Sequence, residues 1–141
     1  MSKYIDMLKE NPLITCIVMQ GDEIIFSSSS SGVKPLLDFY QLYSSSKENL
    51  IVIDRIMGRG AVLLAILIQS TELYTPVISE AGLDLAHEYN LTVHYEELVP
   101  YIVNRSKDGR CPIESSVLDI HDIHEGYQII INTLSNLENK R

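Results

Sequence analysis

The chain has 141 residues, of which 45% are hydrophobic and 21% are charged, and its formal net charge is -8 at pH 7. This composition is typical of a globular protein, so we expect residues 1–141 to form a single domain around one core. The acidic balance argues against nucleic acid and against an anionic membrane as partners, because both attract basic surfaces. No apolar run reaches the roughly 20 residues that span a bilayer, and two cysteines are too few for a disulfide framework, so we expect a cytoplasmic protein.

The first part of the chain predicts a helix, a pair of strands and a second helix. SKYIDMLKE has the apolar spacing of a short helix that ends before Pro12. LITCIVMQ and EIIFSS flank Gly21 and Asp22, which is typical of an antiparallel hairpin. The serines before GVKPLLDFYQLY can cap a helix, and Pro35 falls in its first turn, where the missing N–H is harmless.

From Leu50 onward the predicted strands and helices alternate. Strands at LIVID, LYTPVI and LTVHY are separated by a helix that begins near Arg59 and by a helix from about Ser79 to Tyr89. Strict alternation is typical of crossover units, so we expect these strands to be parallel in an α/β fold. Because AVLLAILI is apolar all round, its helix should lie deep against the sheet. A helix or loop near ELVPYIVNR, a polar loop SKDGRCPIESS and a helix at DIHEGYQIIINTLSNLENK complete the chain.

The motif DRIMGRG places charges directly after an apolar strand, where they are costly unless something pairs with them. A helix N-terminus attracts anions, and open α/β sheets bind ligands at the carboxyl ends of their strands. The motif therefore predicts a site for a small anionic or nucleotide-like ligand beside Asp54. The candidate ligand-binding residues are the basic and glycine residues at the two helix starts, Lys34, Arg55, Gly58, Arg59 and Gly60. The alternative is that one arginine simply pairs with Asp54 or with a nearby glutamate.

The motif NRSKDGRCPIES suggests a second chemistry. Cys111 follows Arg110, and basic neighbours favour the thiolate form of a cysteine. A metal-independent enzyme could use Cys111 or Asp54 as nucleophile or base, with Glu114 as acid and base. The alternative is a rigid loop in which Glu114 or Ser115 caps the next segment. The sequence leaves both interpretations open.

The motif DIHDIHE contains residue types that bind metals. His-x-x-His before an amphipathic helix more often indicates helix capping and a solvated face, and no Cys-x-x-Cys or His-Glu-x-x-His accompanies it. We therefore expect no metal and no cofactor.

Four segments resemble an uncharacterised family of the cytidine-deaminase-like fold, known only as a domain of unknown function. They are SGVKPLLDFY (31–40), DRIMGRGAVLL (54–64), VISEAGLDLA (77–86) and NRSKDGRCPIES (104–115). The resemblance implies a three-layer α/β/α architecture with a mixed sheet, in which an antiparallel hairpin is followed by parallel strands. The most specific motif contains Asn104, Arg105, Cys111, Pro112 and Glu114, and from it we add Asn104 and Arg105 to the candidate ligand-binding residues.

Catalytic deaminases of this fold hold zinc with His-x-Glu or Cys-x-Glu at one helix start and Pro-Cys-x-x-Cys at the next. The corresponding segments here, SSGVKP and DRIMGRG, contain no such ligands. The resemblance therefore implies a pocket without zinc, with Lys34, Asp54, Arg55 and Arg59 near the place of the metal. Three functions follow as hypotheses: a ligand-binding domain, a metal-independent enzyme, and a self-associating interaction module. Exposed sheet edges lead us to expect a homo-oligomer.

Overall fold

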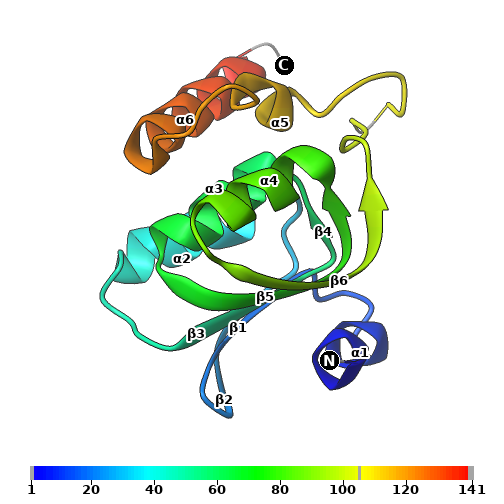
Figure 1. Cartoon of the computed structure of the whole chain (residues 1–141), viewed down its shortest axis with the longest axis vertical. Coiled ribbons are helices and arrows are strands. Elements are labelled where there is room, and N and C mark those ends of the chain that lie inside the picture. Colours follow the sequence, from blue (N-terminus) through cyan, green and yellow to red (C-terminus); the bar gives the residue numbers. More distant parts are fainter. Residues whose placement is uncertain (1, 105, 140–141) are drawn as a thin grey trace.

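The computed structural model describes residues 2–104 and 106–139 (Figure 1). A mixed sheet lies at the centre. Its strands are β1 (Cys16–Gln20), β2 (Glu23–Ser28), β3 (Leu50–Asp54), β4 (Ile56–Met57), β5 (Ser70–Ser79) and β6 (Thr92–Val99). The β1 strand is antiparallel to both β2 and β3, whereas β3, β4 and β6 all pair with β5 in parallel. Because β6 pairs along most of β5, β3 and β4 must follow one another along the opposite edge of β5.

Helices cover both faces of this sheet. They are α1 (Ser2–Glu10), α2 (Lys34–Tyr43), α3 (Arg59–Leu67), α4 (Glu80–Glu88), α5 (Pro112–Ser116) and α6 (Ile123–Asn139). The α1 helix lies on one face, α2, α3 and α4 lie on the other, and α5 and α6 form a further layer outside α3 (Figure 1). The prediction of an α/β fold whose antiparallel hairpin is followed by parallel strands is confirmed.

The main core surrounds α3. This helix is apolar all round, as its sequence predicted, and nearly all of its side chains are buried between the sheet and α6. The two helices pack closely, because a Cβ atom added at Gly126 of α6 would overlap Leu63 Cδ1 of α3. A smaller cluster, which includes Ile5 and Leu8 of α1, fills the other face of the sheet.

In β1 and β3, alternate residues belong to the two clusters, as expected for strands buried on both faces. In β1, Cys16 belongs to the core around α3, whereas Ile17 belongs to the cluster under α1. Cys16 pairs across the strands with Asp54 at the end of β3. This register places the carboxyl of Asp54 on the α3 side of the sheet.

Two predicted elements differ from the structure. The β6 strand continues to Val99, where the sequence suggested a helix or loop, because Glu97, Leu98 and Val99 pair with the end of β5. Strand pairing here overrides the local preference of Glu and Leu for helix. The predicted polar loop contains α5, which begins at Pro112.

Candidate functional site

Buried polar side chains gather where the parallel strands end and the next helices begin. Asp54 ends β3, Arg59 begins α3, Thr75 and Ser79 lie in the second half of β5, and Glu114 lies in α5. We refer to these residues as the buried polar cluster. All are at most 5% exposed. Open α/β sheets usually bind ligands at this edge, so the cluster is the candidate site.

The carboxylate of Glu114 occupies the N-terminus of α3. Its Oε2 accepts hydrogen bonds from the Arg59 N–H (2.6 Å) and from the Ser79 hydroxyl (2.5 Å), and its Oε1 accepts one from the Ile102 N–H (2.8 Å). A Cβ atom at Gly58, which precedes the helix, would lie 2.9 Å from Oε2. A negative charge is thus held at the positive end of a helix dipole, which is a stabilising arrangement.

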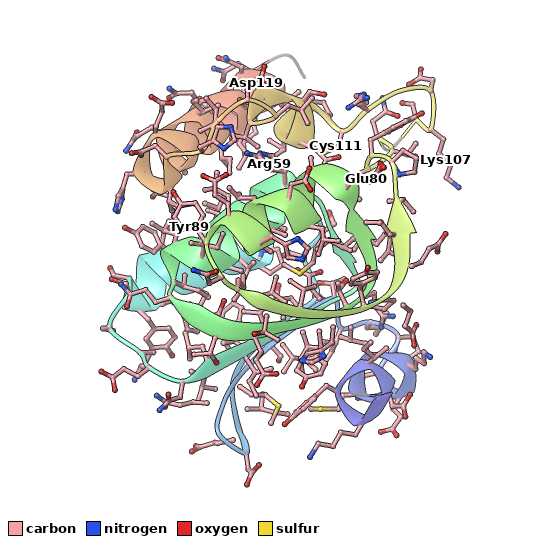
Figure 2. All side chains as sticks on the ribbon, in the orientation of Figure 1. Arg59, Glu80, Tyr89, Lys107, Cys111 and Asp119 are labelled. Carbon is pink, nitrogen blue, oxygen red and sulfur yellow. The ribbon has the colours of Figure 1, made fainter. Side chains whose placement is uncertain are left out.

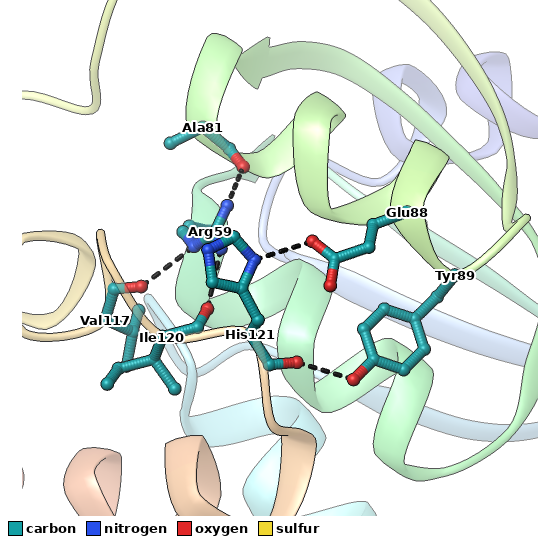
Figure 3. Close-up of polar contacts among 7 residues, drawn as sticks. All are labelled: Arg59, Ala81, Glu88, Tyr89, Val117, Ile120 and His121. Atoms are coloured by element: carbon teal, nitrogen blue, oxygen red, sulfur yellow. Dashed lines mark hydrogen bonds and ion pairs between the residues drawn. The ribbon is translucent and has the colours of Figure 1, made fainter.

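The guanidinium of Arg59 points into a ring of carbonyl oxygens (Figure 3). Its Nε donates to Val117 O (2.8 Å), and its two terminal nitrogens donate to Ala81 O (2.8 Å) and Ile120 O (2.6 Å). Among the residues that the structure describes, no ion pair joins Arg59 to Asp54. The side chain that the sequence placed in an anion pocket therefore anchors the segment after α5 onto α3 and α4.

Two further contacts hold this segment in place. His121 Nδ1 lies 2.7 Å from Glu88 Oε1, and the hydroxyl of Tyr89 donates to His121 O (Figure 3). Figure 2 shows Arg59 between the α3 and α4 layer and the layer of α5 and α6. We call residues 117–121 the anchored segment, because its backbone carbonyls carry most of these contacts.

Asp54 is the least well satisfied member of the buried polar cluster. Its Oδ2 has no hydrogen-bond partner among the described residues. Burial raises the pKa of this carboxyl from 3.8 to about 7, although the N–H groups of Ile56 and Arg55, the Cys16 thiol and the charge of Arg55 lower it in part. Burial, and then the nearby Asp54, raise the pKa of the Cys16 thiol, which makes that cysteine a poor nucleophile.

The other two cations lie apart from Glu114. The guanidinium of Arg55 donates to Leu8 O (2.6 Å), Asn11 O (3.0 Å) and Ile14 O (2.8 Å), so it ties α1 to the end of β3. Lys34 Nζ is exposed and pairs with Asp38 Oδ1 at 3.1 Å. The structure therefore does not bring Lys34, Arg55 and Arg59 together around one open pocket.

The starts of α2 and α3 lie close together. A Cβ atom at Gly60 would lie 2.8 Å from Ile113 Cγ2 and 3.3 Å from Val33 Cγ1, which belongs to the residue before α2. Apolar side chains of Val33, Ile113 and Ile130 fill the space between the helices at this point. Gly60 is needed for this close approach, whereas its predicted contact with a ligand stays a prediction.

The loop before α5 contains the remaining candidates. Asn104 organises the loop, because its side chain bonds both the carboxylate and the N–H of Asp108. Arg105 lies outside the described residues. Cys111 is partly exposed beside α5 (Figure 2), and its N–H donates to Ile102 O. Its role as a nucleophile stays a prediction.

Neither a metal site nor a membrane span is found in the described ranges 2–104 and 106–139. No three His, Cys, Asp or Glu residues there lie where they could share a metal ion. No helix there has the length and apolar character to cross a bilayer.

Sequence reasoning missed three residues of this region. Ser79 precedes α4 and accepts the Gly82 N–H as a helix cap, and a serine before a helix is visible in the sequence. Its hydrogen bond to Glu114 is not visible there, because the two residues are 35 positions apart. Cys16 and Thr75 sit in apolar strands, and only the strand register places Cys16 opposite Asp54. No local pattern marks such pairs.

The fold and the buried polar cluster define an α/β protein with a mixed sheet and a site at its strand ends. The chain belongs to the family described as "TM1506: Domain of unknown function (DUF1893)", whose model matches residues 3–134. It is similar in fold to the crystal structure, at 2.70 Å resolution, of a DUF1893 family protein (TM1506) from Thermotoga maritima. The TM-score is 0.81 and the identity 24%, over 93% of this chain and 87% of that one. None of the curated proteins compared with the chain matches it.

The family resemblance noted in the sequence, to a domain of unknown function, is thereby confirmed. The assignment to the cytidine-deaminase-like fold stays a prediction.

Proposed function

We propose that this protein binds a small anionic or nucleotide-like ligand, whose carboxylate or phosphate takes the place of the Glu114 carboxylate at the N-terminus of α3. One observation carries the proposal. Three donors, the Arg59 N–H, the Ser79 hydroxyl and the Ile102 N–H, converge on one carboxylate at the start of a buried helix. The same arrangement of backbone N–H groups and a hydroxyl binds the oxygens of external anions in other proteins.

Glu114 belongs to an element small enough to move. The α5 helix has five residues and is preceded by the exposed loop around Asp108. Exchange of Glu114 for a ligand anion needs a shift of this short helix, while Arg59 keeps the anchored segment and the start of α3 in place. In this proposal Arg59 positions the site through its backbone and does not use its guanidinium on the ligand.

Asp54 Oδ2 favours a ligand that has a hydrogen-bond donor as well as an anionic group. This oxygen is a buried acceptor without a partner among the described residues, at the same edge of the sheet. A nucleotide-like ligand offers N–H or O–H groups beside its phosphate. The cytidine-deaminase-like fold belongs to the same proposal, and the convergence of the starts of α2 and α3 supports it.

The geometry favours binding over a metal-independent enzyme. Glu114 is 2% exposed and both of its oxygens are occupied by donors, so it is not free to move a proton on a substrate. The thiol beside Asp54 is that of Cys16, which is fully buried. Cys111, Asp54 and Glu114 thus do not form an accessible set of catalytic groups in this structure.

Glu114→Ala tests the proposal, with Glu80→Ala as matched control, because Glu80 is an exposed glutamate in the first turn of α4. The substitution leaves three donors without an acceptor, two of them buried, so we expect a loss of about 1–3 kcal/mol in the free energy of unfolding. Acetate, phosphate or a nucleotide at about 100 times its Kd should restore roughly 2.7 kcal/mol. Thermal unfolding at constant ionic strength measures both effects.

The unmodified protein should respond to the same panel of anions, but at higher concentration, because each anion must displace Glu114. The control variant should behave like the unmodified protein. Two outcomes contradict the proposal. In one, no anion stabilises Glu114→Ala more than Glu80→Ala. In the other, anions rescue the variant while the unmodified protein binds none of them, which would make Glu114 a permanent cap of α3.

A further inference from the structure

The outer edge of β6 is an open edge of the sheet. β6 pairs with β5 on one side, and no backbone hydrogen bond from the described residues reaches its other side. Figure 1 shows it as the outermost strand, beyond β5. An open strand edge carries a row of N–H and C=O groups that can pair with another strand.

This edge also exposes large apolar side chains. Tyr95 is 37% exposed and Leu98 is 44% exposed, on opposite faces of the sheet, and Tyr101 and Val103 beyond the strand are exposed as well. Proteins usually protect long edges by bulges or by charges. The opposite edge has such a bulge, in the pairing of β1 with β2. On β6 the charges are Glu96 and Glu97, which lie between the apolar residues.

We propose that β6 is the interface of a homodimer, in which β6 of a second copy of this chain adds antiparallel to β6 and continues the sheet. A twofold axis perpendicular to the sheet relates the copies in such a pair. Residues directly opposite each other then point to the same face of the sheet. The axis therefore lies midway between the two copies of one residue, which is opposite itself. The choice of that position fixes the register.

The charges on β6 disfavour several registers, and the one centred on Tyr95 adds favourable pairs. Centring the pair on Glu96 or on Glu97 places two carboxylates opposite each other, which is destabilising, and centring it on His94 opposes two imidazoles. Centring it on Tyr95 opposes two tyrosine rings and puts His94 of each copy opposite Glu96 of the other. Aromatic pairs and opposite polar pairs are both favourable across strands.

The surroundings on the α1 face fit this register. The ring of His94 stacks on Tyr74 with centroids 4.3 Å apart, and its Nε2 lies 3.0 Å from Glu72 Oε2, so the imidazole is held in a fixed orientation. Glu96 lies 3.7 Å from Lys9 of α1. The second copy would add one imidazole beside Glu96, so the carboxylate would lie between a lysine and a histidine.

This proposed dimer interface does not include the residues of the site at Glu114.

Cysteine cross-linking tests the register. Residues directly opposite in an antiparallel pair have Cα atoms about 4.5–5.5 Å apart, within the range of a disulfide. In a Cys111→Ser background, which leaves only the buried native Cys16, we expect Tyr95→Cys to form a disulfide-linked dimer under mild oxidation in more than half of the chains. Glu97→Cys, two positions away on the same strand, and Ile24→Cys, which is 51% exposed near the other edge, should remain monomers on a non-reducing gel.

Light scattering on the unmodified protein gives an independent result. We expect twice the mass of the chain at micromolar concentration, and the mass of one chain for Tyr95→Lys, whose circular dichroism should be unchanged because the side chain is exposed. A monomeric unmodified protein would overturn the proposal. Cross-linking of Glu97→Cys or Ile24→Cys to the same extent as Tyr95→Cys would overturn it as well.

Discussion

Asp54 carries the clearest pH dependence of any residue described. Burial raises the pKa of its carboxyl from 3.8 to about 7, so between these pH values the folded protein holds a proton that the unfolded chain has released. The stabilisation from this proton is complete below about pH 3.8 and is lost as the pH rises through about 7. The loss approaches about 1.4 kcal/mol per pH unit within this window.

Asp54→Asn removes this dependence, because the amide is neutral at every pH in this range. Between pH 5 and pH 8 the free energy of unfolding should fall less for the variant than for the unmodified protein. The two decreases should differ by on the order of a few kcal/mol. Urea unfolding at the two pH values measures the difference. Asp84→Asn is the matched control, since Asp84 is an exposed carboxylate of α4. Equal slopes for Asp54→Asn and for the control would show that Asp54 is ionised in the folded protein.

At the scale of the element, the packing of α6 on α3 depends on one glycine. Replacing a glycine inside a helix by alanine usually stabilises the helix by up to about 1 kcal/mol. At Gly126 the sign should reverse, because the new Cβ would overlap Leu63 of α3 and push the helices apart. We expect a net loss of about 1–3 kcal/mol, as overpacked cores show.

Chemical denaturation of Gly126→Ala checks this sign. Gly109→Ala is a suitable comparison, because a Cβ atom there would meet only Asn104 Nδ2 at 3.7 Å, an ordinary contact. Its stability should change little. A more stable Gly126→Ala would mean that α6 does not pack on α3 as closely as the structure shows.

The sequence predicted most of the elements, because their signals are local. The apolar helix at AVLLAILI, the hairpin around Gly21 and the closing helix all appear where their patterns place them. The extension of β6 and the α5 helix were missed, because pairing with β5 and the Pro112 helix start outweigh weak local preferences.

The contacts of the candidate site could not be predicted from the sequence. Asp54, Arg59 and Glu114 are all buried, and a hydrogen bond joins the Arg59 N–H to Glu114. The partners of the Arg59 side chain are backbone carbonyls of residues 81, 117 and 120. Every residue has a backbone carbonyl, so the residue types do not identify these partners. Charge alone therefore suggested an anion pocket where the structure has an anchor.

At the scale of the whole molecule, the sheet separates two cores of unequal size. The cluster under α1 is the smaller one, and Arg55 ties the end of α1 to the sheet through Leu8 O and through two carbonyls just after the helix, Asn11 O and Ile14 O. Regions with few buried contacts open locally at low free energy. We therefore expect α1 to open without the rest of the protein.

Amide hydrogen exchange can resolve this opening. Amides of α1 should exchange well before those of β3 and α3, and Arg55→Ala should accelerate α1 further while leaving α3 protected. Arg110→Ala is a fair comparison, because that arginine is exposed and stacks on the Tyr101 ring away from α1. Simultaneous exchange of α1 and α3 in the unmodified protein would indicate a single cooperative unit instead.

The burial of α3 on every side has a consequence for synthesis on the ribosome. The helix is complete at Leu67, but α6, which covers its outer face, begins only at Ile123. At typical translation rates this interval lasts on the order of several seconds. During that time the outer face of the most apolar helix of the chain has no cover, and the strands β5 and β6, which complete the sheet, follow α3 in the chain. The nascent chain is therefore a potential substrate for chaperones that recognise exposed apolar helices, until α6 has emerged.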